Sequence, residues 1–158
     1  MPNFNRRSLI SFLPIPLIVG LGNTLMARSL TANSSTLSMI VYKTPNCGCC
    51  VKWVVHLEEL GFSVETINVT DTGPIARRYG VPSSLRSCHT AITDGYAIEG
   101  HVPAKDIIRL IEEKPTVAGL AVPGMPVGSP GMEFGDRRDP YQVLAFDSNG
   151  ESRIFASY

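Results

Sequence analysis

The chain has 158 residues with 14 basic and 14 acidic side chains, and no run of basic residues marks a surface for nucleic acid or anionic lipid. This length is typical of one domain. The sequence also contains no phosphate-cradling Gly-Lys-Ser/Thr segment, no Ser-His-Asp arrangement and no usefully spaced carboxylate pair. Nucleotide-binding and hydrolase functions therefore have no residue support.

The N-terminal segment has the pattern of an export signal. Arg6 and Arg7 precede an uncharged, mostly apolar run over 8–27. A retained membrane anchor is the alternative, since the run is just long enough to span a bilayer, but its prolines and glycines disfavour a stable helix. We predict that residues 1–30 are a cleaved signal with a linker to about 38, and that the mature protein is periplasmic and does not span the membrane. The doubled arginine leaves open whether export is general or twin-arginine.

The mature chain alternates between strand and helix patterns in the order β-α-β-α-β-β-α. The expected elements are a strand at 39–42, a helix at 50–60, a strand at 62–69, a helix at 72–79, a hairpin at 89–100 around Asp94-Gly95, and a helix between Pro103 and Pro115. This order predicts a single α/β domain over 39–158, with helices on a mixed four-stranded sheet in a thioredoxin-like arrangement. Residues 76–82 also resemble the segment before the active-site proline loop of thioredoxins. The rival, a ferredoxin-like β-α-β-β-α-β fold, lacks the helix at 72–79.

A C-terminal extension begins at about residue 116. Residues 117–133 are rich in glycine and proline, include Met125 and Met132, and carry almost no charge. Such a segment is too apolar for a disordered tail, so we expect a fixed loop packed on the domain. Asn149-Gly150 then predicts a hairpin over 141–155.

Four cysteines are the most informative residues, and they admit three interpretations. Cys47, Cys49 and Cys50 lie between a strand and a helix, and Cys88 lies far downstream. Two structural disulfides are the plain interpretation for an exported protein, but bonds within the cluster would close almost no loop. Cys47 and Cys50 also form a Cys-x-x-Cys pair at a helix start, where backbone amides and the helix dipole stabilise a thiolate. That pattern is typical of a thiol-disulfide oxidoreductase, although Cys49 would disturb a simple pair.

A soft metal site is the third interpretation, and the one we favour. If the fold is thioredoxin-like, the third strand starts beside the first helix, so Cys88 would face the cluster. Four thiolates around one zinc ion would leave uncompensated negative charge, and the adjacent Cys49 and Cys50 point in different directions. Several thiolate-bridged Cu(I) ions fit better than zinc, because sulfur donors select Cu(I). Met125 and Met132 would be additional thioether donors.

The sequence favours structural roles over metal ligation for the histidines and the single tryptophan. Neighbours in a strand point to opposite faces, so His89 should turn away from the cluster if Cys88 faces it. We expect His101 to cap a helix or contact a loop, and His56 to be solvated on the first helix. Trp53 lies on the apolar face of that helix and is expected in the core.

The chain resembles the CopG-type periplasmic copper-resistance proteins, many of which are catalogued only as a metal-binding domain of unknown function. Four motifs within 39–146 carry the likeness: 44–53, 87–91, 95–104 and 119–133. The resemblance implies a thioredoxin-like fold, copper handling in the bacterial cell envelope and a role in changing the oxidation state of copper, without establishing turnover. The residues that match its cysteine pattern are Cys47, Cys49, Cys50 and Cys88, and those that match its methionine loop are Met125 and Met132.

Together these features predict a periplasmic protein that holds Cu(I), in a multi-copper thiolate cluster, for copper sequestration, transfer or redox interconversion. Its partners would be copper ions and another envelope copper carrier or exporter. Action as a copper oxidoreductase and simple metal binding both remain open. The alternative function is thiol-disulfide exchange at Cys47 and Cys50.

Overall fold

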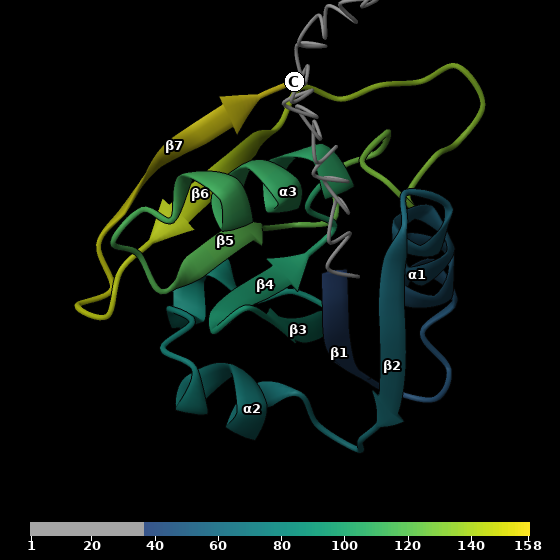
Figure 1. Ribbon diagram of the computed structural model, residues 1–158. Coiled ribbons are helices and arrows are strands. Elements are labelled where there is room, and N and C mark those ends of the chain that lie inside the picture. Colours follow the sequence, from purple (N-terminus) through teal and green to yellow (C-terminus); the bar gives the residue numbers. More distant parts are fainter. Residues whose placement is uncertain (1–36) are drawn as a thin grey trace, which may run out of the picture. The chain divides into compact units, whose positions relative to one another are not determined.

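The computed structural model describes residues 37–158, which form a mixed α/β structure around one seven-stranded sheet (Figure 1). The predicted export signal at 1–30 and most of its linker lie outside the described residues and stay predictions. The strands are β1 (Leu37–Lys43), β2 (Phe62–Asn68), β3 (His89–Thr93), β4 (Tyr96–Gly100), β5 (Gly119–Val122), β6 (Gln142–Phe146) and β7 (Ser152–Ser157). The helices are α1 (Gly48–Glu59), α2 (Gly73–Arg78) and α3 (Ala104–Glu113), with a 3-10 turn at Ser83–Leu85. None of the helices between residues 37 and 158 has the length and apolar character needed to cross a membrane.

The strand order in the sheet is β2-β1-β3-β4-β5-β6-β7. β1 pairs in parallel with β2, and β4 with β5, while the remaining neighbours are antiparallel. The four strands expected from the sequence are therefore one part of a larger sheet. The expectation that residues 117–133 form only a loop is wrong at Gly119–Val122, because this segment is β5 and joins the C-terminal hairpin to the rest of the sheet.

Side-chain alternation divides the core between the two faces of the sheet. Ile98 and Leu120 pack on one face with apolar residues of α1 and α3, including Trp53. Ala97 and Ala121, their neighbours in the strands, pack on the other face with α2 and the 3-10 turn. Trp53 is fully buried, as expected from its place on the apolar face of α1.

Strand register brings three separate segments to one end of the sheet. β1 ends at Lys43, which lies opposite His89 at the start of β3. β3 and β4 form the expected hairpin, with positive φ at Asp94 and Gly95, so the residue before β3 and the residue after β4 are also neighbours. The cysteine segment after β1, Cys88 before β3 and His101 after β4 therefore meet at this end.

Candidate metal centre

The first part of the centre is the N-terminus of α1. Cys47 is the residue that caps this helix, and Cys49 and Cys50 lie in its first turn. Cys47 and Cys50 are joined by a disulfide with their Cα atoms 5.3 Å apart. Cys50 is fully buried, whereas Cys47 and Cys49 are partly exposed. Helical geometry thus separates the two adjacent cysteines, as expected, with Cys50 directed inward.

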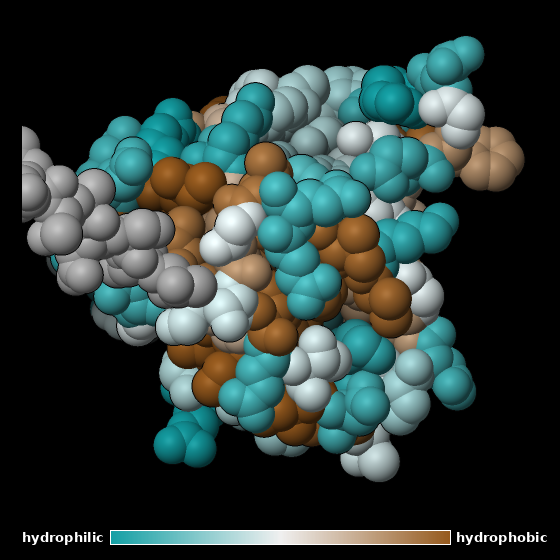
Figure 2. All heavy atoms as spheres, turned by 45° about the vertical axis from the view of Figure 1, so that its right-hand side comes forward, coloured by the Kyte–Doolittle hydropathy of each residue, from teal (hydrophilic) through white to brown (hydrophobic). Residues whose placement is uncertain are grey.

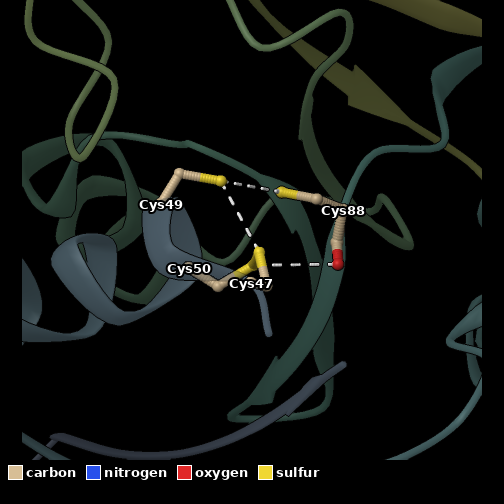
Figure 3. Close-up of side chains that lie close together, drawn as sticks. All are labelled: Cys47, Cys49, Cys50 and Cys88. Atoms are coloured by element: carbon tan, nitrogen blue, oxygen red, sulfur yellow. Dashed lines mark hydrogen bonds between the residues drawn. A yellow bond between two sulfur atoms is a disulfide. The ribbon is translucent and has the colours of Figure 1, made fainter. Parts of the chain in front are cut away.

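Cys88 completes a group of four cysteines (Figure 3). Its Sγ lies 4.0 Å from Cys49 Sγ, which in turn lies 3.5 Å from Cys47 Sγ. Cys50 Sγ is 3.8 Å from the Cys88 carbonyl oxygen, and all four sulfurs lie within 4.8 Å of one another. The structure brings the four sulfurs together from two segments, as expected, while their ligation of a metal remains a prediction.

Burial controls the protonation of Cys88. Desolvation, followed by the proximity of Cys49, raises the pKa of the Cys88 thiol to about 12. The side chain is therefore a neutral thiol near pH 7 when no metal is bound. A metal ion that binds here has to displace this proton, so metal affinity at Cys88 should increase with pH.

Two histidines also contact Cys88. His101 Nε2 lies 3.2 Å and His89 Nδ1 lies 3.4 Å from Cys88 Sγ. His89 contacts Cys88 even though the two are neighbours in the chain, because Cys88 precedes β3 and the strand alternation begins only at His89. The expectation that His89 turns away from Cys47, Cys49 and Cys50 stays a prediction. The ring of His89 also lies 4.3 Å from that of Trp53 between centroids, in the core.

Both histidines are fully buried and neutral. Burial lowers the pKa of His89 to about 3, and the nearby His101 adds to this effect. Burial also lowers the pKa of His101, against an opposing hydrogen bond to Pro130. His56 was expected to be solvated, but it is half-buried and its Nε2 accepts a hydrogen bond from the Ala104 amide at 3.2 Å.

A buried carboxylate holds the segment that carries Cys88. Glu99 accepts hydrogen bonds from the Ser87 amide at 2.6 Å and from the Thr90 hydroxyl at 2.7 Å. These contacts fix the residues on either side of the Cys88-His89 pair. Burial raises the pKa of Glu99 while both hydrogen bonds lower it, burial being the stronger effect. Sequence reasoning missed this residue, because its partners become neighbours only when β3 pairs with β4.

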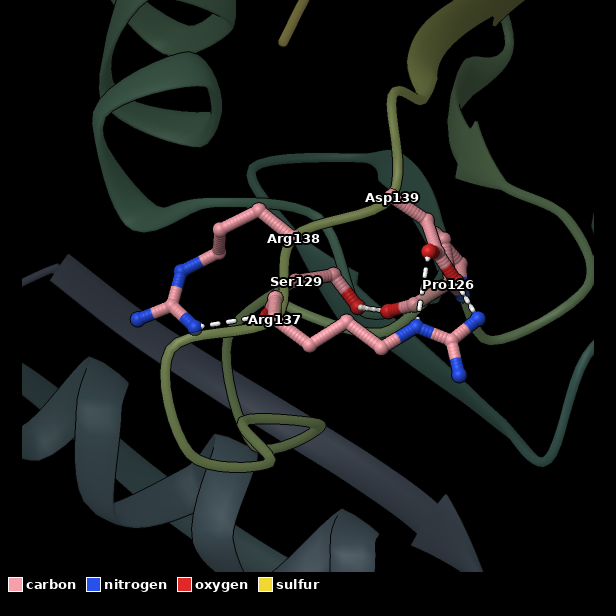
Figure 4. Close-up of polar contacts among 5 residues, drawn as sticks. All are labelled: Pro126, Ser129, Arg137, Arg138 and Asp139. Carbon is pink, nitrogen blue, oxygen red and sulfur yellow. Dashed lines mark hydrogen bonds and ion pairs between the residues drawn. The ribbon is translucent and has the colours of Figure 1, made fainter.

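The loop after β5 packs directly on α1 at the cysteine group. Gly131 has a φ of +82°, and a Cβ at this position would lie 2.8 Å from both the Cys49 carbonyl oxygen and the Trp53 nitrogen. The loop is braced internally by a Ser129 hydroxyl that donates to the Pro126 carbonyl at 2.7 Å (Figure 4). Further along, an ion pair joins Arg137 to Asp139 at 3.0 Å (Figure 4). The close approach of Gly131 to α1 packs this loop on the domain, as expected for residues 117–133 outside β5.

The two candidate methionines have different surroundings. Met132 lines a surface hollow of about 440 Å³ together with Cys49 and Phe134. Met125 does not line this hollow and is 41 % exposed. The side of the molecule formed by α1 and β2 also shows apolar surface between polar side chains (Figure 2). The structure therefore places Met132 beside the cysteine group and leaves Met125 on the surface.

Four sulfurs that converge at the start of a helix, in a mixed α/β structure, are typical of two classes of protein. One class binds metal ions through thiolates, and the other exchanges dithiols with disulfides. Comparison with solved structures assigns the family. The chain is similar to two structures of the copper resistance protein CopG, described as form 1 and form 2, each with 49% sequence identity and a TM-score of 0.74. The alignments cover 78% of this chain for form 1 and 77% for form 2, and 98% of each of those chains. The chain therefore belongs to the CopG family.

A family described as a protein of unknown function, DUF411, matches residues 85–132, a range that contains Cys88, His101 and the loop after β5. No curated relative matches the chain.

Proposed function

We propose that this protein binds Cu(I) in a thiolate-bridged cluster held by Cys47, Cys49, Cys50 and Cys88. The observation that carries the proposal is the convergence of four sulfurs within 4.8 Å of one another. Sulfur donors favour Cu(I) among biological metals, and several monovalent ions neutralise four thiolates better than one zinc ion does. The name of the 49% identical relatives, copper resistance protein, supports copper as the metal.

Met132 supplies an additional thioether donor in this proposal. It shares the surface hollow with Cys49, and its flexible side chain can turn its sulfur toward a copper ion bound there. Met125 is the weaker candidate because it is exposed outside the hollow.

The biological role that fits these features is copper sequestration, transfer or redox interconversion in the cell envelope. Export through the N-terminal segment, a periplasmic location and exchange with another envelope copper carrier or exporter belong to this proposal. The strand order β2-β1-β3-β4, with Cys47, Cys49 and Cys50 at the start of α1, supports a thioredoxin-like core extended by β5, β6 and β7.

Cu(I) loading requires reduction of the Cys47–Cys50 disulfide. Two sulfurs bonded to each other are not available as two thiolates, so the bonded form offers only Cys49 and Cys88. Reduction by a thiol delivers two electrons and two protons, and converts the reductant to its own disulfide. The reduced form is therefore the one that holds a cluster.

A Cu(I) titration of the anaerobic, reduced protein against a chromogenic chelator tests the proposal. We expect more than one Cu(I) per chain in the wild type and a severe loss of stoichiometry in Cys49→Ser and in Cys88→Ser. Ser84→Ala, an exposed change four residues before Cys88 that removes no sulfur, is the control and should bind like the wild type. Wild-type stoichiometry in both cysteine variants would rule the proposal out. X-ray absorption of the loaded protein should show sulfur ligation and a short copper–copper distance.

A second candidate function is thiol-disulfide exchange. It is favoured by the Cys47–Cys50 disulfide at the start of α1, with Cys47 accessible and Cys50 fully buried. A substrate dithiol would reduce this bond and itself become a disulfide. In an insulin-reduction assay this function requires that Cys47→Ser abolish turnover, while Cys49→Ser and Cys88→Ser retain most of it. The copper function makes the last two variants the damaging ones.

A further inference from the structure

Cys88 lies just outside the sheet, so strand pairing alone does not place its sulfur. β3 begins one residue later, at His89, and the strand ladders do not include Cys88. Its Sγ nevertheless lies 4.0 Å from the Sγ of Cys49, which belongs to α1. The orientation of a metal ligand depends on the hydrogen bonds of the groups around it. The contacts of the segment before β3 therefore bear on the proposed cluster.

The end of β4 forms a seat for Ser87. Glu99 Oε1 accepts a hydrogen bond from the Ser87 amide at 2.6 Å. The next residue, Gly100, has a φ of +70°, and a Cβ there would lie 2.8 Å from both the Cβ and the Oγ of Ser87. The same Cβ would lie 2.6 Å from the Val122 carbonyl oxygen, which is a backbone atom. Ser87 thus packs on the bare backbone of β4 while Glu99 fixes its amide.

Ser87 connects this seat to the sulfur. Its hydroxyl donates a hydrogen bond to Cys88 Sγ at 3.9 Å. On the other side of the Cys88-His89 pair, the Thr90 hydroxyl donates to Glu99 Oε2 at 2.7 Å. The two oxygens of one carboxyl group therefore hold the residues that flank Cys88 and His89.

The burial of Glu99 is not explained by packing. The side chain is fully buried, and it makes no ion pair with a cationic side chain between residues 37 and 158. A buried carboxyl group costs free energy unless hydrogen bonds compensate for the lost water. Both of the hydrogen bonds described above go to the segment around Cys88. Holding that segment is therefore what this side chain contributes and an apolar one would not.

We propose that Glu99 is a positioning residue for the copper cluster, which it serves without touching metal. Through Ser87 and Thr90 it holds Cys88 where its sulfur meets the sulfurs of α1. A shorter side chain could not reach both partners from the same place on β4, so Cys88 would lose its fixed distance to Cys49. This inference rests on the proposed copper function and adds to it a residue that sets the geometry of one ligand.

Glu99→Asp and Glu99→Gln separate reach from charge. Asp keeps the carboxylate but is one methylene shorter, whereas Gln keeps the length, an oxygen for the Ser87 amide and an NH2 group for the Thr90 hydroxyl. In a Cu(I) competition with a chelator, Glu99→Asp should weaken binding by the reduced protein about tenfold, and Glu99→Gln should stay close to the wild type. Glu65→Asp is the matched control, because Glu65 is exposed on β2, which β1 and β3 separate from β4. Wild-type affinity in Glu99→Asp, or equal losses in Asp and Gln, would overturn the inference.

A metal-free measurement keeps this test independent of the copper function. In Cys49→Ser with the Cys47–Cys50 disulfide intact, Cys88 is the single thiol, and its alkylation by iodoacetamide reports how firmly it is held. Addition of Glu99→Asp should raise the alkylation rate severalfold, and addition of Glu99→Gln should not. Equal rates with Asp and Gln, in a wild type with full Cu(I) stoichiometry, remove only this inference. The expected rates in a wild type that binds no Cu(I) remove the proposed function and leave Glu99 as the residue that positions Cys88.

Discussion

Replacement of Gly131 by alanine tests whether the loop after β5 is held by its close approach to α1. The new Cβ would lie 2.8 Å from the Cys49 carbonyl oxygen and 2.8 Å from the Trp53 nitrogen, both of which are backbone atoms that cannot rotate away. The φ of +82° adds a second penalty. Left-handed backbone costs an L-residue about 1–2 kcal/mol, and overpacking costs about 1–3 kcal/mol. If the loop stays in place, Gly131→Ala should lower the free energy of unfolding by about 2–5 kcal/mol.

Gly124→Ala is a matched control for this experiment. Gly124 lies in the same loop with a φ of +78°, but nothing lies within 4 Å of the position of its Cβ. This control should therefore lose only the backbone contribution of about 1–2 kcal/mol. Urea unfolding measures the stability of both variants, and a copper titration shows whether Gly131→Ala has instead moved the loop away from the site. If both variants match each other in stability and in copper affinity, the close contact does not position the loop.

Three other predictions concern the site. His89 has a pKa of about 3 in the folded protein and an ordinary value of 6.5, so the unfolded chain takes up a proton first as the pH falls. The free energy of unfolding should therefore decrease as the pH falls below about 6.5, and should be about 2 kcal/mol lower at pH 5 than at pH 7. Equal free energies from urea unfolding at pH 5 and pH 7 would contradict this. Met132→Leu should weaken Cu(I) binding about tenfold, or about 1.4 kcal/mol, while Met125→Leu should not, and equal effects in a chelator competition would remove the distinction. Copper should quench the fluorescence of Trp53, whose ring lies 4.3 Å from that of His89; unchanged emission at full loading would place the metal elsewhere.

Local patterns in the sequence predicted most of the elements up to α3. The turn at Asp94-Gly95 and the ends of α3 were predictable because the residues there restrict their own backbone conformation. These residues are Asp94, Gly95, Pro103 and Pro115. β5 escaped prediction because Gly119–Val122 is short and lies among glycines and prolines. Its strand conformation comes from pairing with β4 on one side and β6 on the other, which are partners distant in the sequence.

The contrast between local patterns and pairing of distant segments also explains why the cysteines of the site were predicted better than the histidines. Three cysteines in four positions are informative on their own, and a simple fold argument was enough to bring Cys88 to them. His101 was assigned a cap or loop contact, and its contact with the Pro130 carbonyl agrees with the latter. Its approach to Cys88 depends on the β3–β4 register, which no local pattern contains. The contact between His89 and Cys88 does not follow from strand alternation, because Cys88 lies outside β3.

The disulfide and the proposed copper cluster would compete for the same sulfur atoms. Cys47 and Cys50 can be bonded to each other or ligate copper, but not both, so the redox state of this pair sets the number of Cu(I) ions that the protein can hold. Oxidation of the pair would therefore lower the capacity of the proposed cluster for Cu(I). An oxidised wild-type protein that bound as much Cu(I) as the reduced one would contradict this competition.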